Sequence, residues 1–85
     1  MYRPTVKVEL FGSLAVHTDG ERTVEVEAGD LRELFAALGE KYPGMQPALE
    51  RGVSVSIDGR IYTQELFQKI GPDNEIVLLA QLRGG

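Results

Sequence analysis

One stretch of this sequence has the apolar spacing of a long helix, and it lies between segments that alternate like strands. Asp30 is a favoured N-cap residue, and Glu33 follows three positions later, as in a capping box. The apolar residues that follow predict one buried helical stripe, formed by Leu31, Leu34, Phe35, Leu38 and Tyr42. Pro43-Gly44 ends the predicted helix. A chain with a single amphipathic helix must bury that stripe against other elements.

Those other elements are predicted strands. In the first of them Val6, Val8 and Leu10 share one face, and this period of two indicates a half-buried strand. The last is apolar on both faces, which suits a central strand. The predicted strands cover residues 5–11, 22–27, 53–57, 60–62 and 75–81. One helix against these strands predicts an α+β fold with two layers, in which a mixed sheet packs on one main helix.

Turn-forming residues separate these elements. Asp19-Gly20 and Asp58-Gly59 are pairs that favour tight turns, because both central residues of a type I′ turn need positive φ. Residues 71–74 are also dense in turn formers. Residues 12–18 predict a longer loop between the first two strands.

Two short helical turns are expected in the connections. One is predicted at residues 47–50. The other is predicted at residues 65–70, with Leu66, Phe67 and Ile70 facing the core.

The composition suits one small domain. The 85 residues carry a net charge of −4 with scattered basic residues, which argues against a nucleic-acid partner. Cysteine is absent, so disulfides and thiolate chemistry are excluded. No apolar run approaches the roughly 20 residues that span a bilayer, and the first residues do not resemble a signal peptide. We therefore expect a cytoplasmic protein with no membrane partner.

The sequence finishes in Leu82-Arg83-Gly84-Gly85, directly after the apolar last strand. Extended residues span about 3.3 Å each, so four of them reach roughly 13 Å beyond the sheet. Glycines have no Cβ, cost conformational entropy when ordered and pack nothing, so this ending adds no stability. It does allow a narrow enzyme pocket to take the tail and place a terminal carboxylate against a reagent. We expect a domain at residues 1–81 and a flexible tail at 82–85.

At this point the sequence resembles a known family. The order of elements is similar to the β-grasp (ubiquitin-like) fold, and the last four residues match the tail of ubiquitin. The body more closely resembles the prokaryotic MoaD/ThiS sulfur carriers. That resemblance is carried by VKVELFG at 6–12, VSVSIDGRIY at 53–62 and GPDNEIVLL at 71–79. The resemblance implies that residues 1–81 are a β-grasp domain.

The resemblance implies a mechanism. A partner of the ubiquitin-activating type would use ATP to adenylate the carboxylate of Gly85, and a sulfur donor protein would convert the adenylate to a thiocarboxylate. Gly84 would let the backbone lie flat in the enzyme channel. A sulfur-accepting synthase subunit would take the sulfur, with molybdopterin synthesis as the leading pathway and this chain as the small subunit of the synthase. The chain would be a co-substrate that binds no cofactor and has no active site of its own.

Other functions stay open. The sulfur could serve thiamine, cysteine or tRNA thiolation, or Gly85 could be conjugated to lysines of other proteins. In a different class, the chain could be a β-grasp interaction module whose Gly-Gly ending is incidental.

Further candidates concern partner binding. Phe11, Val77 and Leu79 are expected on the sheet face away from the helix, where an apolar patch could dock a partner. Leu82 and Arg83 could be read by the same partner. Glutamates at 21, 25 and 27 line up at strand spacing, and we expect them to form a solvated face that could steer a basic partner. His17, the only histidine, is expected at the surface without a catalytic role.

Overall fold

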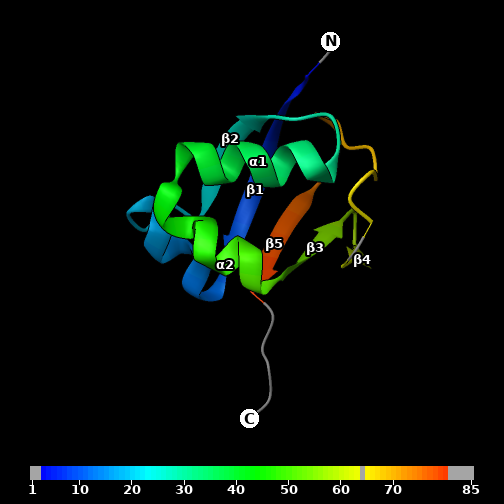
Figure 1. Ribbon diagram of the computed structural model, residues 1–85. Helices are drawn as coiled ribbons and strands as arrows, with labels where there is room; N and C mark the ends of the chain where they lie inside the picture. Colours follow the sequence, from blue (N-terminus) through cyan, green and yellow to red (C-terminus); the bar gives the residue numbers. More distant parts are fainter. Residues whose placement is uncertain (1–2, 64, 81–85) are drawn as a thin grey trace.

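The computed structural model describes residues 3–63 and 65–80. Five strands form one sheet in the order β2-β1-β5-β3-β4, and β1 and β5 are parallel while the other neighbours are antiparallel (Figure 1). The strands are β1 (Thr5–Phe11), β2 (Thr23–Glu27), β3 (Val53–Ile57), β4 (Arg60–Tyr62) and β5 (Ile76–Ala80). The sheet is mixed and β5 is its central strand, as predicted from the apolar residues on both of its faces.

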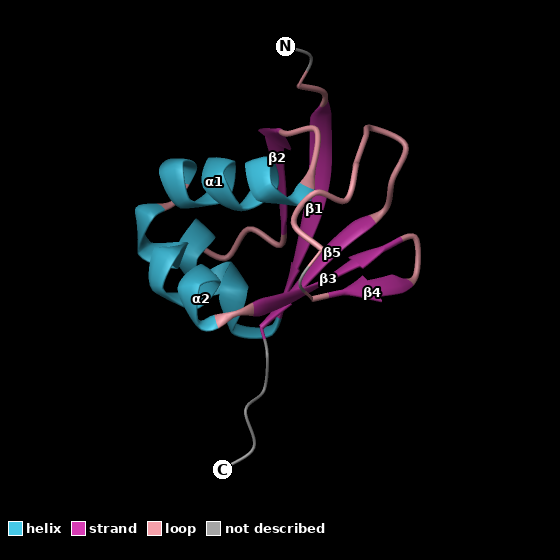
Figure 2. Cartoon of the chain, turned by 45° about the vertical axis from the view of Figure 1, so that its right-hand side comes forward, coloured by secondary structure: helices cyan, strands magenta, loops and turns pink. Residues whose placement is uncertain are grey.

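The helices lie on one side of this sheet. Figure 2 shows α1 (Leu31–Lys41) and α2 (Gln46–Arg51) on the same side, joined by a 3-10 turn at Pro43–Met45. A second 3-10 segment, Gly12–Thr18, forms the connection that the sequence predicted as a longer loop. The two-layer α+β fold is therefore confirmed, and no helix within the described ranges is long and apolar enough to cross a bilayer.

The N-terminus of α1 is capped largely as predicted. Oδ1 of Asp30 accepts a hydrogen bond from the N–H of Glu33 at 2.8 Å. The Glu33 carboxylate accepts from the N–H of Gly29 at 2.7 Å, one residue before the cap, and its other oxygen lies 3.4 Å from Nε of Arg3. The bond from Asp30 satisfies a donor that the helix itself leaves unpaired, and the bond from Gly29 holds the preceding backbone, so together they fix where α1 begins.

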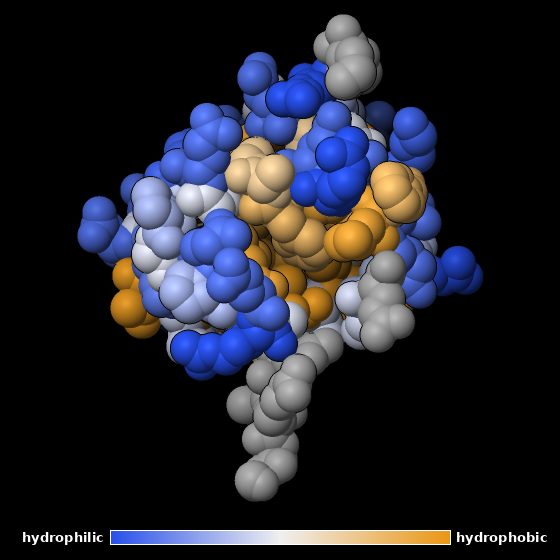
Figure 3. Space-filling view, viewed as in Figure 1, coloured by the Kyte–Doolittle hydropathy of each residue, from blue (hydrophilic) through white to orange (hydrophobic). Residues whose placement is uncertain are grey.

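The core lies between α1 and the inner face of the sheet. Every second residue of β1 is buried, as are Leu31, Leu34 and Leu38 of the helical stripe. An 11-residue helix is only about 16 Å long, so it cannot cover five strands. In the space-filling view, apolar side chains accordingly reach the surface in a hollow beside α1 and α2 (Figure 3).

Both predicted Asp-Gly turns adopt positive φ at their two residues. The angles are 53° and 88° at Asp58 and Gly59, which join β3 directly to β4. They are 56° and 84° at Asp19 and Gly20, which end the 3-10 segment instead of closing a two-residue hairpin. Local chemistry thus predicted the backbone conformation, whereas the length of the first loop depended on packing of the 3-10 segment, where Leu14 is buried.

The prediction for residues 65–70 was wrong in two respects. The described part of this segment forms a turn and an isolated bridge, not a helical turn, and only Ile70 of the three expected core residues is buried. Leu66 is 44% exposed and Phe67 is 75% exposed. The carbonyl of Leu66 accepts from the N–H of Arg32 at 2.8 Å, so this backbone caps the first turn of α1. A segment used in that way cannot also turn those two side chains inward.

Asp58 ties the entry of β5 to the β3–β4 turn. Its Oδ1 accepts from the N–H of Glu75 at 2.8 Å, and its Oδ2 accepts from Nδ2 of Asn74 at 2.7 Å. The hydrogen bond from the Glu75 backbone, and then that from the Asn74 side chain, lower the pKa of Asp58 below its usual value. Since both donors favour the ionised carboxylate, this link depends on pH.

Substitution Asp58→Asn should reduce the acid sensitivity of the fold. A carboxyl whose pKa is lowered in the folded state stabilises the protein fully above its unfolded pKa, and that contribution is lost as pH falls through the folded pKa. We expect the melting temperature of the wild type to fall more steeply than that of the variant as pH is lowered below about 4. Asp73→Asn, in the neighbouring exposed turn, is the control and should follow the wild-type curve.

Candidate functional site

In the sequence, the predicted tail follows the middle strand of the sheet. Leu82, Arg83, Gly84 and Gly85 lie outside the described residues, so the structure shows only the base from which they continue. At that base, β1 pairs with Leu79 and β3 pairs with Ala80. The end of β5 is therefore paired on both sides up to the last described residue.

The three residues predicted to form an apolar patch lie on the sheet face away from α1. Val6, Val8 and Leu10 alternate inward, so Phe11 points to the opposite face and is 59% exposed. Phe11 pairs directly with Leu79 across the β1–β5 ladder. Val77 and Leu79 are half-buried and alternate with the buried residues of β5.

Ile61 belongs to the same face and was not predicted. Ser56 pairs with Val77 on one side and with Ile61 on the other, so these three share the outer face. Ile61 is 56% exposed. A strand of three residues is too short to show an alternating pattern, and its facing direction is set only by its register with β3.

A shallow pocket lies beside the end of β5. It has a volume of about 350 Å³ and is lined by Phe11, Gly12, Ser13, Leu79 and Ala80. Gly12 has φ of 67°, and a Cβ placed on it would meet no heavy atom within 4 Å, so glycine is needed for the backbone angle and not for space. The pocket adjoins the last described residue, so a partner that follows the tail would meet this apolar surface.

Possible metal ligands and the single histidine were the other candidates for a site. Within residues 3–63 and 65–80, no group of histidine, cysteine or carboxylate side chains could hold a metal ion. His17 is half-exposed on the 3-10 segment. What the described residues show is an exposed apolar face beside the end of β5.

Comparison with known proteins gave matches among solved structures. No family model matches the sequence, and no curated protein matches it. The solution structure of small archaeal modifier protein 1 from Methanosarcina acetivorans superimposes with a TM-score of 0.82 at 20% identity, covering 100% of both chains.

Two matches come from complexes. A chain of the BexX/CysO complex of Amycolatopsis orientalis gives a TM-score of 0.75 at 20% identity, over 94% of this chain and 99% of that one. A chain of the complex of subunits 1 and 2 of the molybdopterin-converting factor of Helicobacter pylori gives 0.67 at 25% identity, over 95% and 99%. The architecture of this chain is therefore the ubiquitin-like β-grasp, and the resemblance to MoaD/ThiS-type proteins that its sequence indicated extends over the whole fold.

Proposed function

We propose that this chain is a sulfur carrier protein. When Gly85 is the terminal residue, an enzyme of the ubiquitin-activating type adenylates its carboxylate, and a sulfur donor converts the adenylate to a thiocarboxylate. The observation that carries the proposal is the placement of the end of β5, the last described residues before the tail. It lies in the central strand of a β-grasp sheet, paired with two neighbouring strands and next to an exposed apolar pocket.

The chemistry requires an activated carboxylate. An oxygen of the Gly85 carboxylate attacks the α-phosphorus of ATP, and pyrophosphate leaves. The sulfur nucleophile then attacks the acyl carbon, and AMP leaves with the bonding electron pair. Glycine leaves that carbon unobstructed, and Gly84 adds no side chain to the approach. ATP is bound by the partner, and this chain supplies only the reacting group.

The experiment is the intact mass of the full chain after incubation with a candidate activating enzyme, ATP and sulfide. The expected result is a mass increase equal to the replacement of one oxygen by sulfur. Omitting ATP should prevent the increase, because the carboxylate is then not activated. An unchanged mass with several activating enzymes that work on their own carriers would contradict the proposal.

We propose that the sulfur is delivered to molybdopterin, with this chain as the small subunit of the synthase. The support is the fold match to a chain in the molybdopterin-converting-factor complex. The test is whether the thiocarboxylated chain supports molybdopterin formation with a large synthase subunit. Transfer to a thiamine, cysteine or tRNA system alone would place the chain in another pathway.

A second candidate is conjugation of Gly85 to lysines of other proteins. The fold match to the archaeal modifier, over 100% of both chains, is the observation that favours it. The adenylate is the same intermediate, attacked by a lysine amine instead of sulfur. Isopeptide-linked Gly-Gly remnants on cellular proteins, seen by mass spectrometry and absent without the gene, would identify this use.

Substitution Phe11→Ala should weaken activator binding. An aromatic side chain at the centre of a docking patch commonly contributes at least about 2 kcal/mol, so we expect Kd to rise roughly 30-fold. The matched control is Phe67→Ala, because Phe67 is 75% exposed but lies on the β4–β5 connection. Titration calorimetry of both variants gives the comparison, and equal losses would show that Phe11 has no special role.

A further inference from the structure

β2 lies at one edge of the sheet, and its register shows which backbone groups are free. The N–H of Leu10 donates to the carbonyl of Arg22 at 2.6 Å, in the same register that pairs Val8 with Val24. Hydrogen-bonded and non-hydrogen-bonded pairs alternate along an antiparallel ladder. The backbone groups of every second residue from Arg22 onward therefore bond to β1. The backbone groups of the residues between them point away from β1.

Thr23, Glu25 and Glu27 are those intervening residues. Their N–H and C=O groups point to the open edge of the sheet. Among the residues that the structure describes, the only bond made there is from Nζ of Lys41 to the carbonyl of Glu25, at 3.0 Å. A row of unpaired backbone groups over a five-residue strand is a template about 17 Å long for another strand.

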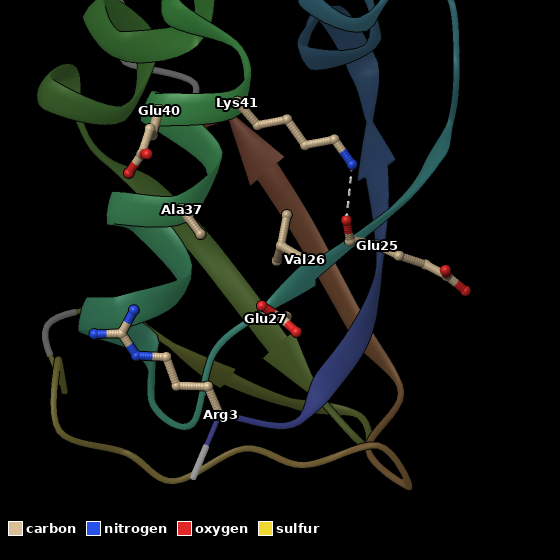
Figure 4. Close-up of a pocket in the computed structure, with 7 residues that line it drawn as sticks. All are labelled: Arg3, Glu25, Val26, Glu27, Ala37, Glu40 and Lys41. Carbon is tan, nitrogen blue, oxygen red and sulfur yellow. Dashed lines mark hydrogen bonds between the residues drawn. The ribbon is translucent and has the colours of Figure 1, made fainter. Parts of the chain in front are cut away.

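A hollow of about 490 Å³ lies between this edge and α1. Figure 4 shows the Lys41 side chain crossing it from the end of α1 to the Glu25 carbonyl, while the Glu25 carboxylate points away from the helix. The hollow is lined by Arg3, Glu25, Val26, Glu27, Ala37, Glu40 and Lys41. A strand added to β2 would occupy this space.

The residues around the hollow carry a net charge of −1, from three glutamates against Arg3 and Lys41, although the Glu25 carboxylate itself lies on the outer face of the sheet. Both basic side chains already contact other groups, since Nε of Arg3 lies 3.4 Å from Glu33 and Nζ of Lys41 donates to the Glu25 carbonyl. Within the described ranges, the carboxylates of Glu25, Glu27 and Glu40 make no ion pair or hydrogen bond. Lys7 pairs with Glu25 across the β1–β2 ladder, so it lies on the same outer face and offsets part of the charge of Glu25.

We propose that β2 accepts an extended segment of a partner protein as an added strand, and that basic and apolar residues alternate in this segment. Its backbone would pair with the free groups of Thr23, Glu25 and Glu27. Basic side chains would lie beside Glu25 and Glu27 on the outer face, where opposite charges on adjacent strands attract. The alternate, apolar side chains would lie toward Val26 and Ala37. This surface is separate from the pocket at the end of β5.

A second copy of the chain is a poor occupant. Two-fold pairing of β2 with itself around Glu25 would set that carboxylate against its own copy and leave Glu27 close to the same region. Like charges directly opposite each other destabilise a strand pair. The edge is thus protected against self-association while it remains open to a basic strand.

Lys41 acts as a gate on this edge. Its ammonium group donates a hydrogen bond to the Glu25 carbonyl, the outward carbonyl at the centre of β2. The same group lies 5.7 Å from the centroid of the Tyr42 ring. An exposed lysine bond of this kind is weak, so a strand with several backbone bonds can displace it. Removing the ammonium should therefore strengthen binding.

The first test uses a peptide as long as β2, blocked at both ends, in which lysine and valine alternate. Added to the isotope-labelled full chain, it should slow amide exchange at Thr23, Glu25 and Glu27 while Val24 and Val26, already bonded to β1, change little. A peptide with glutamate in place of lysine is the control and should not bind. Protection without this alternation, or spectral changes centred on Phe11 and Leu79, would overturn the proposal, as would a concentration-dependent dimer in sedimentation.

The second test uses variants. Lys41→Met keeps the apolar stem and should bind the lysine–valine peptide several-fold more tightly. Glu25→Gln removes only charge and should bind a few-fold more weakly, with less dependence on salt. Glu25→Pro also removes an outward N–H that makes no bond to β1, and should bind at least about tenfold more weakly. If Glu25→Pro fails to fold, the affinities of Lys41→Met and Glu25→Gln still test the proposal. Unchanged affinity for the peptide in both of these variants would refute the proposed surface.

Discussion

Deletion of Gly85 should abolish sulfur acquisition while leaving the fold intact. The deletion still leaves a glycine carboxylate, on Gly84, but withdraws it by about 3.3 Å. Misplacing a reacting group by only about 1 Å can cost 10²-fold in rate. We therefore expect no detectable thiocarboxylate under conditions that convert the full chain completely, measured by intact mass.

Two controls distinguish an effect on the tail from an effect on the folded domain. The melting temperature of the shortened chain should equal that of the full chain, because the residues that form the core lie between Val6 and Leu78. Gly85→Ala keeps the length and adds one methyl group beside the reacting carbon, so it should slow conversion without abolishing it. Normal conversion of the shortened chain would mean that the carboxylate position is unimportant, and the carrier proposal would fall.

Substitution Leu34→Ala should have the largest effect on stability. Leu34 is 0% exposed in the middle of α1 and packs against the inner face of the sheet. Truncating a fully buried leucine usually costs about 2–5 kcal/mol, because transfer energy is lost and a cavity remains. A domain of 85 residues has a total stability of roughly 4–13 kcal/mol, so this is a large fraction of it.

The free energy of unfolding is measured by urea unfolding at constant pH. In thermal unfolding the melting temperature should fall by roughly 8–40 °C. Arg32→Ala is the matched control, since Arg32 is exposed on the same helix and alanine is at least as good a helix former as arginine. It should change the free energy of unfolding by less than about 0.5 kcal/mol. Similar losses in both variants would show that α1 is not anchored by its buried stripe.

The predictions that held depended on neighbours in the chain. The Asp30 cap, the helical stripe and the Asp-Gly turns are determined by side chains within a few residues of one another. The central position of β5 could also be read, because a strand with apolar residues on both faces must be covered on both sides or placed in the middle of a sheet.

The outward position of Leu66 and Phe67 could not be predicted from neighbouring residues in the sequence. In isolation the segment 65–70 has the apolar spacing of a helical turn. Its backbone carbonyls are instead recruited by the unpaired N–H groups at the start of α1, more than 30 positions away in the sequence. The local sequence of residues 65–70 does not show that their carbonyls will bond to the start of α1.

By itself, then, the sequence determined the main strands and α1, the buried faces of β1 and α1, and the chemical nature of the Gly-Gly tail, because these follow from residue spacing and local hydrogen bonding. Only the tertiary structure decided which strands are neighbours. That order places Phe11 against Leu79 beside the end of β5, puts Ile61 on the same face, and leaves the outward backbone groups of β2 open under Lys41. Strand pairing joins residues far apart in the chain, and its register is set by packing of the whole core.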